Sequence, residues 1–294
     1  MDWEALEVQL ARFESDPSLD DESALASRIE ALDFLTLLDQ TLQARDWRGE
    51  RADLRERSAA LRGRLEGIDR RLFRRVREWI LSPQCNSRDL RHELNCFTTY
   101  SSSQVGHAHF GYDALDVLLD GVWGAPAEPE TSPPLPPEMI HYEPTPARVI
   151  LDLVDHGQLG PDDVFFDLGS GLGQVALLVN LLTGIPSRGI EYQAHLWRQS
   201  ERIAHSFGTV NVAFVCADAR DADFSEGTSF FLFSPFKGRL LRDVLTKLRD
   251  EAQRRPISVY TYGPCTADVY QQTWLRSQIP DTNHPFKLAI FKSQ

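Results

Sequence analysis

Apolar residues recur every three or four positions along much of the first 80 residues. One series begins at Leu25 and continues through Ile29, Leu32, Leu35 and Leu38. A second series, on an arginine-rich stretch, comprises Leu54, Leu61, Leu65, Ile68, Leu72 and Val76. This spacing places each series on one face of an α-helix. Because residues 46–49 separate the two, the pattern predicts an antiparallel helical hairpin in an all-α N-terminal domain.

A proline-rich stretch at 124–138 ends this helical pattern. A short helix with a glycine stop is expected just before it, at 110–121. Clustered prolines disfavour both helix and sheet interior, so the stretch is predicted to be an extended linker. We therefore expect a helical domain over 1–123, a linker over 124–138 and a second domain over 139–294.

From residue 139 onward, helical and strand-like patterns alternate. Helices are expected at 145–157, 172–183 and 238–253, with a further one after residue 191. Strands are expected at 163–168, 187–191, 211–216, 229–233, 256–262, 273–279 and 286–292. This alternation is typical of a doubly wound α/β fold. The prediction is a mostly parallel, seven-stranded, Rossmann-like sheet.

The first of these strands runs into the sequence Asp167-Leu168-Gly169-Ser170-Gly171-Leu172-Gly173-Gln174. Its glycines follow D-x-G-x-G-x-G, whereas dinucleotide sites use G-x-G-x-x-G. Gln174 stands where that pattern has its last glycine, which disfavours an NAD-type oxidoreductase. An acid at the strand end would repel a pyrophosphate but suits a cationic ligand. The loop therefore favours S-adenosylmethionine (SAM), which carries a sulfonium and an ammonium group.

Polar residues also follow the next three strands, at the edge where an open α/β sheet binds its ligand. We expect Asp167, with Gly169 and Gly171, to frame the amino-acid end of SAM. Glu191 is placed to accept hydrogen bonds from the ribose hydroxyls, and Asp218, with Asp221 as its competitor, from the adenine amino group. The turn 234–236 lies where the reactive methyl would emerge.

At these residues the sequence resembles class I SAM-dependent methyltransferases, and most nearly the disruptor-of-telomeric-silencing family of non-SET histone lysine methyltransferases. Residues 167–175 resemble that family's D-L-G-S-G-V-G-Q-V loop, and 142–145 its Y-x-x-T loop, which closes over SAM. Glu191 and Asp218 match its ribose-side and adenine-side acids. The cofactor-binding residues so predicted are Tyr142, Thr145, Asp167, Gly169, Gly171, Gly173, Gln174, Glu191, Asp218 and Ala219.

The sequence departs from that family at the turn expected to face the methyl acceptor. The family carries N-N-F after the fourth strand, whereas this chain has Ser234-Pro235-Phe236, which half resembles the N-P-P-[FY] turn of amino-group methyltransferases. Methyl transfer is an in-line displacement in which the protein mainly positions the reactants. Ser234, Phe236 and Tyr142 are the candidate catalytic residues, and the substrate pocket is expected to include His141 and Tyr262.

Two functions stay open on this pattern. The first is a SAM-dependent methyltransferase acting on a nitrogen or oxygen of a protein or small molecule, with S-adenosylhomocysteine as the coproduct. The second is a SAM-binding regulatory or scaffold protein without catalytic turnover, in which the helical domain carries the function.

The composition of the chain limits the kinds of partner and the location that are expected for it. The net charge of −12 argues against a general nucleic-acid binder, and no apolar run is long enough for a membrane span. Four scattered cysteines and an acidic N-terminus favour a cytoplasmic protein. The set Cys85, His92, Cys96, His107 and His109 matches no zinc spacing, so no metal is predicted. The arginines at 70, 71, 74, 75 and 77 form either a solvated helix face or a docking face for an acidic partner.

Overall fold

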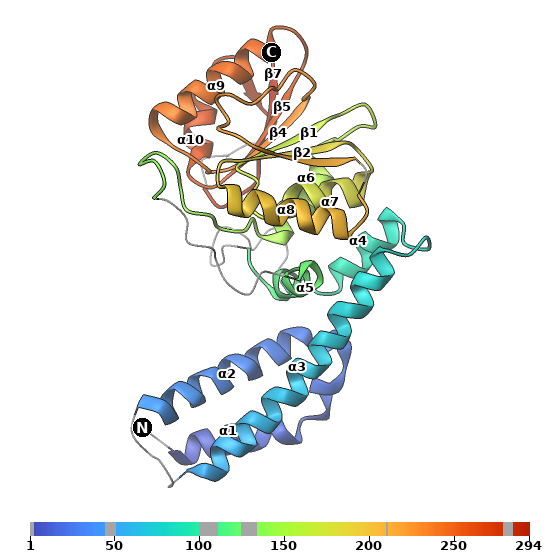
Figure 1. Cartoon of the computed structure of the whole chain (residues 1–294), viewed down its shortest axis with the longest axis vertical. Helices are drawn as coiled ribbons and strands as arrows, with labels where there is room; N and C mark the ends of the chain where they lie inside the picture. Colours follow the sequence, from blue (N-terminus) through green and yellow to red (C-terminus); the bar gives the residue numbers. More distant parts are fainter. Residues whose placement is uncertain (1–2, 45–50, 100–110, 125–133, 210, 279–284) are drawn as a thin grey trace. The chain divides into compact units, whose positions relative to one another are not determined.

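A computed structural model describes residues 3–44, 51–99, 111–124, 134–209, 211–278 and 285–294 of the chain (Figure 1). Their contacts divide the chain into two compact units that alternate along the sequence, and one of the boundaries falls within α4 (Ser87–Asn95). The first unit holds the described residues of 1–82, 93–99 and 113–123, and the second holds the remaining described residues. The division expected at 123 and the linker at 124–138 stay a prediction.

The first unit is helical, as expected. Its elements are α1 (Trp3–Ser15), η1 (Pro17–Asp20), η2 (Glu22–Ala24), α2 (Leu25–Ala44), α3 (Ala52–Ile80) and α5 (Ala114–Trp123). Both predicted apolar series contribute to its core, which comprises Leu10, Leu19, Ala31, Leu35, Leu38, Leu42, Leu54, Leu61, Leu65 and Ile68. The predicted turn at 46–49 lies outside the described residues.

Gly121 does not stop the helix that precedes the proline-rich stretch, so that prediction was wrong. The helix α5 continues to Trp123. A Cβ on Gly121 would lie 2.1 Å from the ring of Phe73, so the glycine instead permits close packing of α5 on α3.

Part of the α3 arginine cluster is engaged within the helical unit. Arg75 forms ion pairs with Glu22 (2.7 Å) and Glu93 (3.1 Å). Arg77 donates a hydrogen bond to the carbonyl of Val122 at 2.7 Å. These contacts tie α3 to its neighbours, so the cluster is not purely a docking face.

The second unit contains the predicted seven-stranded sheet. Its strands are β1 (Phe165–Leu168), β2 (Ser187–Glu191), β3 (Val212–Cys216), β4 (Ser229–Phe233), β5 (Ser258–Tyr262), β6 (Leu275–Ser277) and β7 (Ala289–Ser293). Their order is β3-β2-β1-β4-β5-β7-β6. The first five strands are parallel, and β7 pairs antiparallel with both β5 and β6.

Helices cover both faces of this sheet, which confirms the doubly wound fold. Figure 1 shows α6 (Ala147–His156), α7 (Gln174–Thr183) and α8 (Ala194–Ser206) on one side, and α9 (Gly238–Ala252) and α10 (Cys265–Tyr270) on the other. The strand order reverses direction between β1 and β4, which lie side by side. A ligand site is expected beyond the carboxyl ends of the strands at such a switch point.

The connection from β3 to β4 has no helix. Residues 217–228 form turns and bends, with Phe224 fully buried in the core between the sheet and α9. Parallel strands are usually joined by a helical crossover, so this short segment depends on other contacts for its position. In the described part of the chain, none of the helices combines the length and apolar character needed to cross a bilayer.

Candidate functional site

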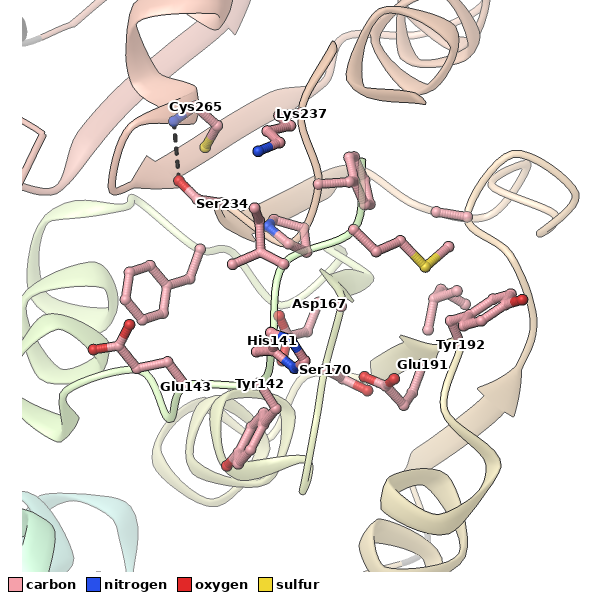
Figure 2. Close-up of a pocket in the computed structure, with 18 of the residues that line it drawn as sticks. His141, Tyr142, Glu143, Asp167, Ser170, Glu191, Tyr192, Ser234, Lys237 and Cys265 are labelled. Carbon is pink, nitrogen blue, oxygen red and sulfur yellow. Dashed lines mark hydrogen bonds between the residues drawn. The ribbon is translucent and has the colours of Figure 1, made fainter. Parts of the chain in front are cut away.

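A cavity of about 450 Å³ opens at the carboxyl ends of the strands, where β1 and β4 lie side by side. Figure 2 shows Asp167, Ser170 and Glu191 on one side of it, and Ser234, Lys237 and Cys265 on the other. Its walls come from the strand ends, the first turns of α9 and α10, and the stretch 139–145. The predicted site residues that line it are His141, Tyr142, Thr145, Asp167, Gly169, Gln174, Glu191, Ala219, Ser234 and Phe236.

Asp167 is the most perturbed acid in this cavity. Its side chain is 3% exposed, and its Oδ2 has no hydrogen-bond partner among the described residues. Burial and the nearby charge of Glu191 raise its pKa to about 8. The hydroxyl of Ser170, three residues on, is likewise buried without a partner there. Unpaired buried polar atoms are rare in proteins, so both suit a ligand that brings hydrogen-bond donors.

Glu191 holds the glycine loop as well as facing the cavity. Its Oε2 accepts a hydrogen bond from the backbone N–H of Gly171 at 2.8 Å, and its Oε1 accepts one from Gln193 at 2.7 Å. Burial raises the pKa of this carboxyl, while the two backbone donors oppose that shift. Each oxygen keeps a second lone pair that can accept from a ligand.

Glycine is required in the loop by protein side chains that lie against it. All three loop glycines have positive φ. An added Cβ would lie 2.2 Å from Pro235 at Gly169, 2.0 Å from Tyr142 at Gly171 and 2.3 Å from Phe214 at Gly173. Of the three, only Gly169 lines the cavity. The sequence pattern indicated a close approach of the backbone but did not identify these neighbours.

One wall of the cavity is an extended stretch that precedes α6. Its Met139 forms an isolated antiparallel bridge with Phe236, and Ile140 donates a backbone hydrogen bond to Pro235 at 3.0 Å. Glu138 caps α9 by accepting from the backbone N–H groups of Arg239 (2.6 Å) and Leu240 (3.1 Å). These contacts hold Tyr142 at the cavity.

The two other predicted residues near this wall are bonded to each other. Gln174, at the start of α7, donates through Nε2 to the carbonyl of Thr145 at 3.0 Å. Both side chains are buried. Their role toward a cofactor stays a prediction.

Asp218 does not line the cavity, although its neighbours Ala217 and Ala219 do. Its carboxylate is held by Arg220, whose Nη2 lies 2.8 Å from Oδ2 and whose backbone N–H donates to Oδ1 at 2.9 Å. These contacts lower the pKa of Asp218. The predicted contact with an adenine amino group therefore stays a prediction.

Most of the residues predicted to act at the reacting methyl are hydrogen-bonded to, or packed against, other parts of the protein. The Ser234 hydroxyl accepts from the backbone N–H of Cys265 at 2.9 Å and donates to the carbonyl of Tyr262 at 3.3 Å. Phe236 is 5% exposed and packs into the core. Tyr262 is fully buried, and its ring packs against Phe233 with centroids 5.1 Å apart. Ser234 and Phe236 thus shape the cavity wall.

Several cavity residues carried no sequence signal. They include Met139, Tyr192, Lys237, Leu240, Leu241, Asp268 and Phe286. No motif marks them, because most contribute apolar surface from helix starts and loops that only the fold brings together. Within the described ranges, no three histidine, cysteine or acidic side chains are placed to hold a metal ion. His107 and His109 lie outside the described residues.

Comparison with known proteins places this site in a family context. Residues 140–231 match the family model described as Histone methylation protein DOT1. The comparison with curated proteins gives no match. The family match confirms the resemblance predicted from the loop at Asp167. The C-terminal part of the chain is thus similar to a family of class I SAM-dependent methyltransferases over residues 140–231.

Among solved structures, an RNA methyltransferase from Salinibacter ruber with bound S-adenosyl-L-homocysteine is 21% identical, with a TM-score of 0.39, and the alignment covers 51% of this chain and 92% of that one. A SAM-dependent methyltransferase from Thiobacillus denitrificans is 22% identical, with a TM-score of 0.35 and coverage of 42% and 50%. A ribosomal protein L11 methylase from Lactobacillus delbrueckii subsp. bulgaricus is 12% identical, with a TM-score of 0.39 and coverage of 50% and 77%. Nothing about the acceptor follows from these likenesses.

Proposed function

We propose that this chain is a SAM-dependent methyltransferase that transfers the methyl group by in-line displacement to a nitrogen or oxygen of a protein or small molecule. The observation that carries the proposal is the pair of buried carboxylates, Asp167 and Glu191, at the ends of neighbouring strands in one cavity. Such a pair fits a ligand that brings both an ammonium group and two adjacent hydroxyls.

The residues fit the parts of SAM in order along the cavity. The unpartnered Oδ2 of Asp167 and the hydroxyl of Ser170 would receive the amino-acid end. Glu191 would accept from the ribose hydroxyls. The adenine ring would lie in the apolar stretch made by Ile190, Ala217, Ala219, Leu240 and Leu241.

When bound, SAM supplies a methyl group already activated by its sulfonium, so the chain has to orient the acceptor and exclude water. Ser234 and Phe236 fix the wall through which the acceptor approaches. Because the Ser234 hydroxyl already has two protein partners, proton removal from a protonated acceptor falls to His141, Glu143 or Asp268, which line the cavity and are exposed.

The proposal is tested with SAM labelled with tritium in the methyl group, incubated with the chain and a fractionated lysate. We expect label in the protein or small-molecule fraction, with S-adenosylhomocysteine formed in equal amount. The control is Glu191→Ala, which should transfer far less label when SAM is held near the Kd of the wild type. A chain that binds SAM but forms no S-adenosylhomocysteine with any fraction would favour the regulatory or scaffold alternative, and label found only in RNA would contradict the acceptor class.

Binding of SAM should release a proton from Asp167. The pKa of this carboxyl is raised to about 8, so at neutral pH the free site is mostly protonated. An ammonium group stabilises the ionised form and lowers that pKa. The affinity for SAM should therefore rise with pH between 6 and 8, by up to roughly tenfold per unit at the low end.

Calorimetry in two buffers of different ionisation enthalpy, at pH 7, measures this proton directly. The Asp167→Asn variant is the matched control, since it keeps the shape and cannot ionise. It should bind more weakly and exchange no proton from this site. Equal proton release from Asp167→Asn and the wild type would rule out Asp167 as the source.

A further inference from the structure

The crossover at 217–228 supplies part of the cavity wall without a helix of its own. Ala217 and Ala219 line the cavity. The turn closes on itself, because the carbonyl of Asp218 accepts from the backbone N–H groups of Asp221 (2.9 Å) and Ala222 (3.1 Å). The carbonyls of Arg220 and Ala222 point away from this turn toward α9. The position of this part of the wall therefore depends on the hydrogen-bond donors that α9 presents to those carbonyls.

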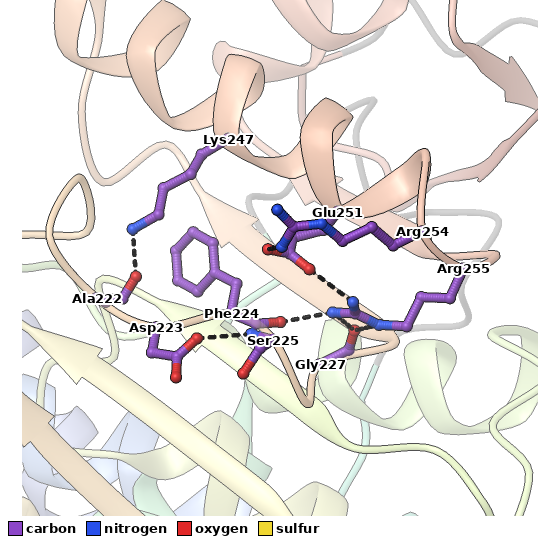
Figure 3. Close-up of polar contacts among 9 residues, drawn as sticks. All are labelled: Ala222, Asp223, Phe224, Ser225, Gly227, Lys247, Glu251, Arg254 and Arg255. Carbon is purple, nitrogen blue, oxygen red and sulfur yellow. Dashed lines mark hydrogen bonds and ion pairs between the residues drawn. The ribbon is translucent and has the colours of Figure 1, made fainter.

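Lys247 of α9 binds both carbonyls with one ammonium group. Its Nζ donates to the carbonyl of Arg220 at 2.8 Å. It also donates to the carbonyl of Ala222 (Figure 3). The same ammonium lies 4.7 Å from the centre of the Phe224 ring, which is fully buried. A cation on an aromatic face is attracted to it, so the ring helps to fix the lysine. Lys247 thus fastens the half of the crossover that borders the cavity.

A second set of contacts, at the C-terminal end of the same helix, holds the other half. Arg255 follows α9 by three residues and donates through Nη2 to the carbonyls of Phe224 and Gly227, each at 2.6 Å. Glu251, which is 7% exposed, pairs with Arg255 at 2.6 Å (Figure 3). Lys247, Glu251 and Arg255 stand four residues apart. The contacts of Arg255 therefore lie near the start of β4, and not near Ala217 and Ala219, which line the cavity.

We propose that Lys247 is a positioning residue for the adenine-side wall of the cavity, and sets the affinity for SAM without touching it. The inference rests on the proposed function, because it takes the wall at Ala217 and Ala219 as the adenine site. Without the ammonium, the carbonyls of Arg220 and Ala222 turn to water and the wall moves. The amino-acid end, at Asp167, and the acceptor side, at Ser234, are held by other elements.

The test compares Lys247→Met with Lys247→Arg. Methionine keeps most of the side-chain length and a contact with Phe224 but donates no hydrogen bond, whereas arginine can still donate to both carbonyls. We expect Lys247→Met to weaken SAM and S-adenosylhomocysteine binding by roughly five- to twentyfold in calorimetry. The KM for SAM should rise by a similar factor with kcat unchanged at saturating SAM, and Lys247→Arg should restore most of the affinity.

Arg255→Met is the matched control, because it loosens the same crossover away from the cavity. It should lower the melting temperature at least as much as Lys247→Met while changing SAM affinity less than twofold. The inference is overturned if Lys247→Met binds SAM like the wild type, or if Arg255→Met weakens binding equally. A wild-type chain that fails to bind SAM would overturn the proposed function as well, and measuring the wild type first separates the two failures.

Discussion

Gly171→Ala is expected to remove most of the SAM affinity of the chain. The added Cβ would lie 2.0 Å from Cε2 and 2.3 Å from Cδ2 of Tyr142, well inside contact distance. Tyr142 is half-buried against the loop and lines the cavity, so its ring would be displaced at the site itself. Overpacking of this kind costs about 1–3 kcal/mol, and the φ of +53° adds strain for any residue with a Cβ. We expect the Kd for SAM to rise on the order of a hundredfold.

Two variants separate the clash from the strain. Gly208 has a φ of +62°, and a Cβ added there would have no atom within 4 Å, so Gly208→Ala carries a similar strain without the overlap. It should lose some stability and keep its SAM affinity. Adding Tyr142→Ala to Gly171→Ala removes the overlap and should recover part of the binding. Calorimetry with a melting curve for each variant measures both quantities, and Gly171→Ala with wild-type affinity would contradict the packing described for the loop.

The fold of the second unit was predictable because its central strands are short, buried and rich in aromatic and branched residues. Phe230 and Phe231 of β4, for example, are fully buried on opposite faces of the sheet. Such apolar runs between glycines and helical stretches leave few alternatives to a parallel sheet. The short helix α10 was missed, since six residues are too few to show a helical repeat of apolar positions.

In the helical unit, the spacing of apolar residues does not predict every buried side chain. Arg28 lies on the apolar face of α2 and is fully buried. Its Nε lies 2.6 Å from Oδ1 of Asp69, and its other nitrogens donate to carbonyls that include those of Leu19 (3.2 Å) and Glu22 (3.0 Å). A buried charge is tolerated only when partners surround it. The charge partner Asp69 lies 41 residues away, and the carbonyls belong to residues that precede α2, so the apolar spacing within α2 could not reveal this arginine.

The candidate site likewise contains residues that the sequence predicted and residues that it could not predict. Asp167 and Glu191 were predictable because each ends a strand and the edge of the sheet brings strand ends together. The roles of Tyr142 against Gly171, of Arg220 on Asp218 and of Lys247 on the crossover depend on contacts that no motif encodes. Motifs identify residues that touch a ligand directly, whereas the residues that hold them in place need the fold.

Glu191→Ala is expected to weaken SAM binding by about a hundredfold or more. A carboxylate that accepts two hydroxyl hydrogen bonds loses about 1.5–3 kcal/mol for each, and 1.4 kcal/mol is tenfold in affinity. The variant also leaves the backbone N–H groups of Gly171 and Gln193 without their acceptor, so the glycine loop itself should loosen. Part of the loss is offset, because the repulsion that raises the pKa of Asp167 disappears with Glu191.

The ribose role is isolated by comparing S-adenosylhomocysteine with its 2′,3′-dideoxy analogue. The wild type should bind the intact ribose far more tightly, whereas Glu191→Ala should bind both ligands with nearly equal affinity. Glu191→Gln keeps the shape and one acceptor oxygen, so its preference should fall between the two. Circular dichroism verifies that each variant is folded. If Glu191→Ala still preferred the ribose hydroxyls as strongly as the wild type, another group would have to bind them, and Glu191 would serve only to hold Gly171 and Gln193.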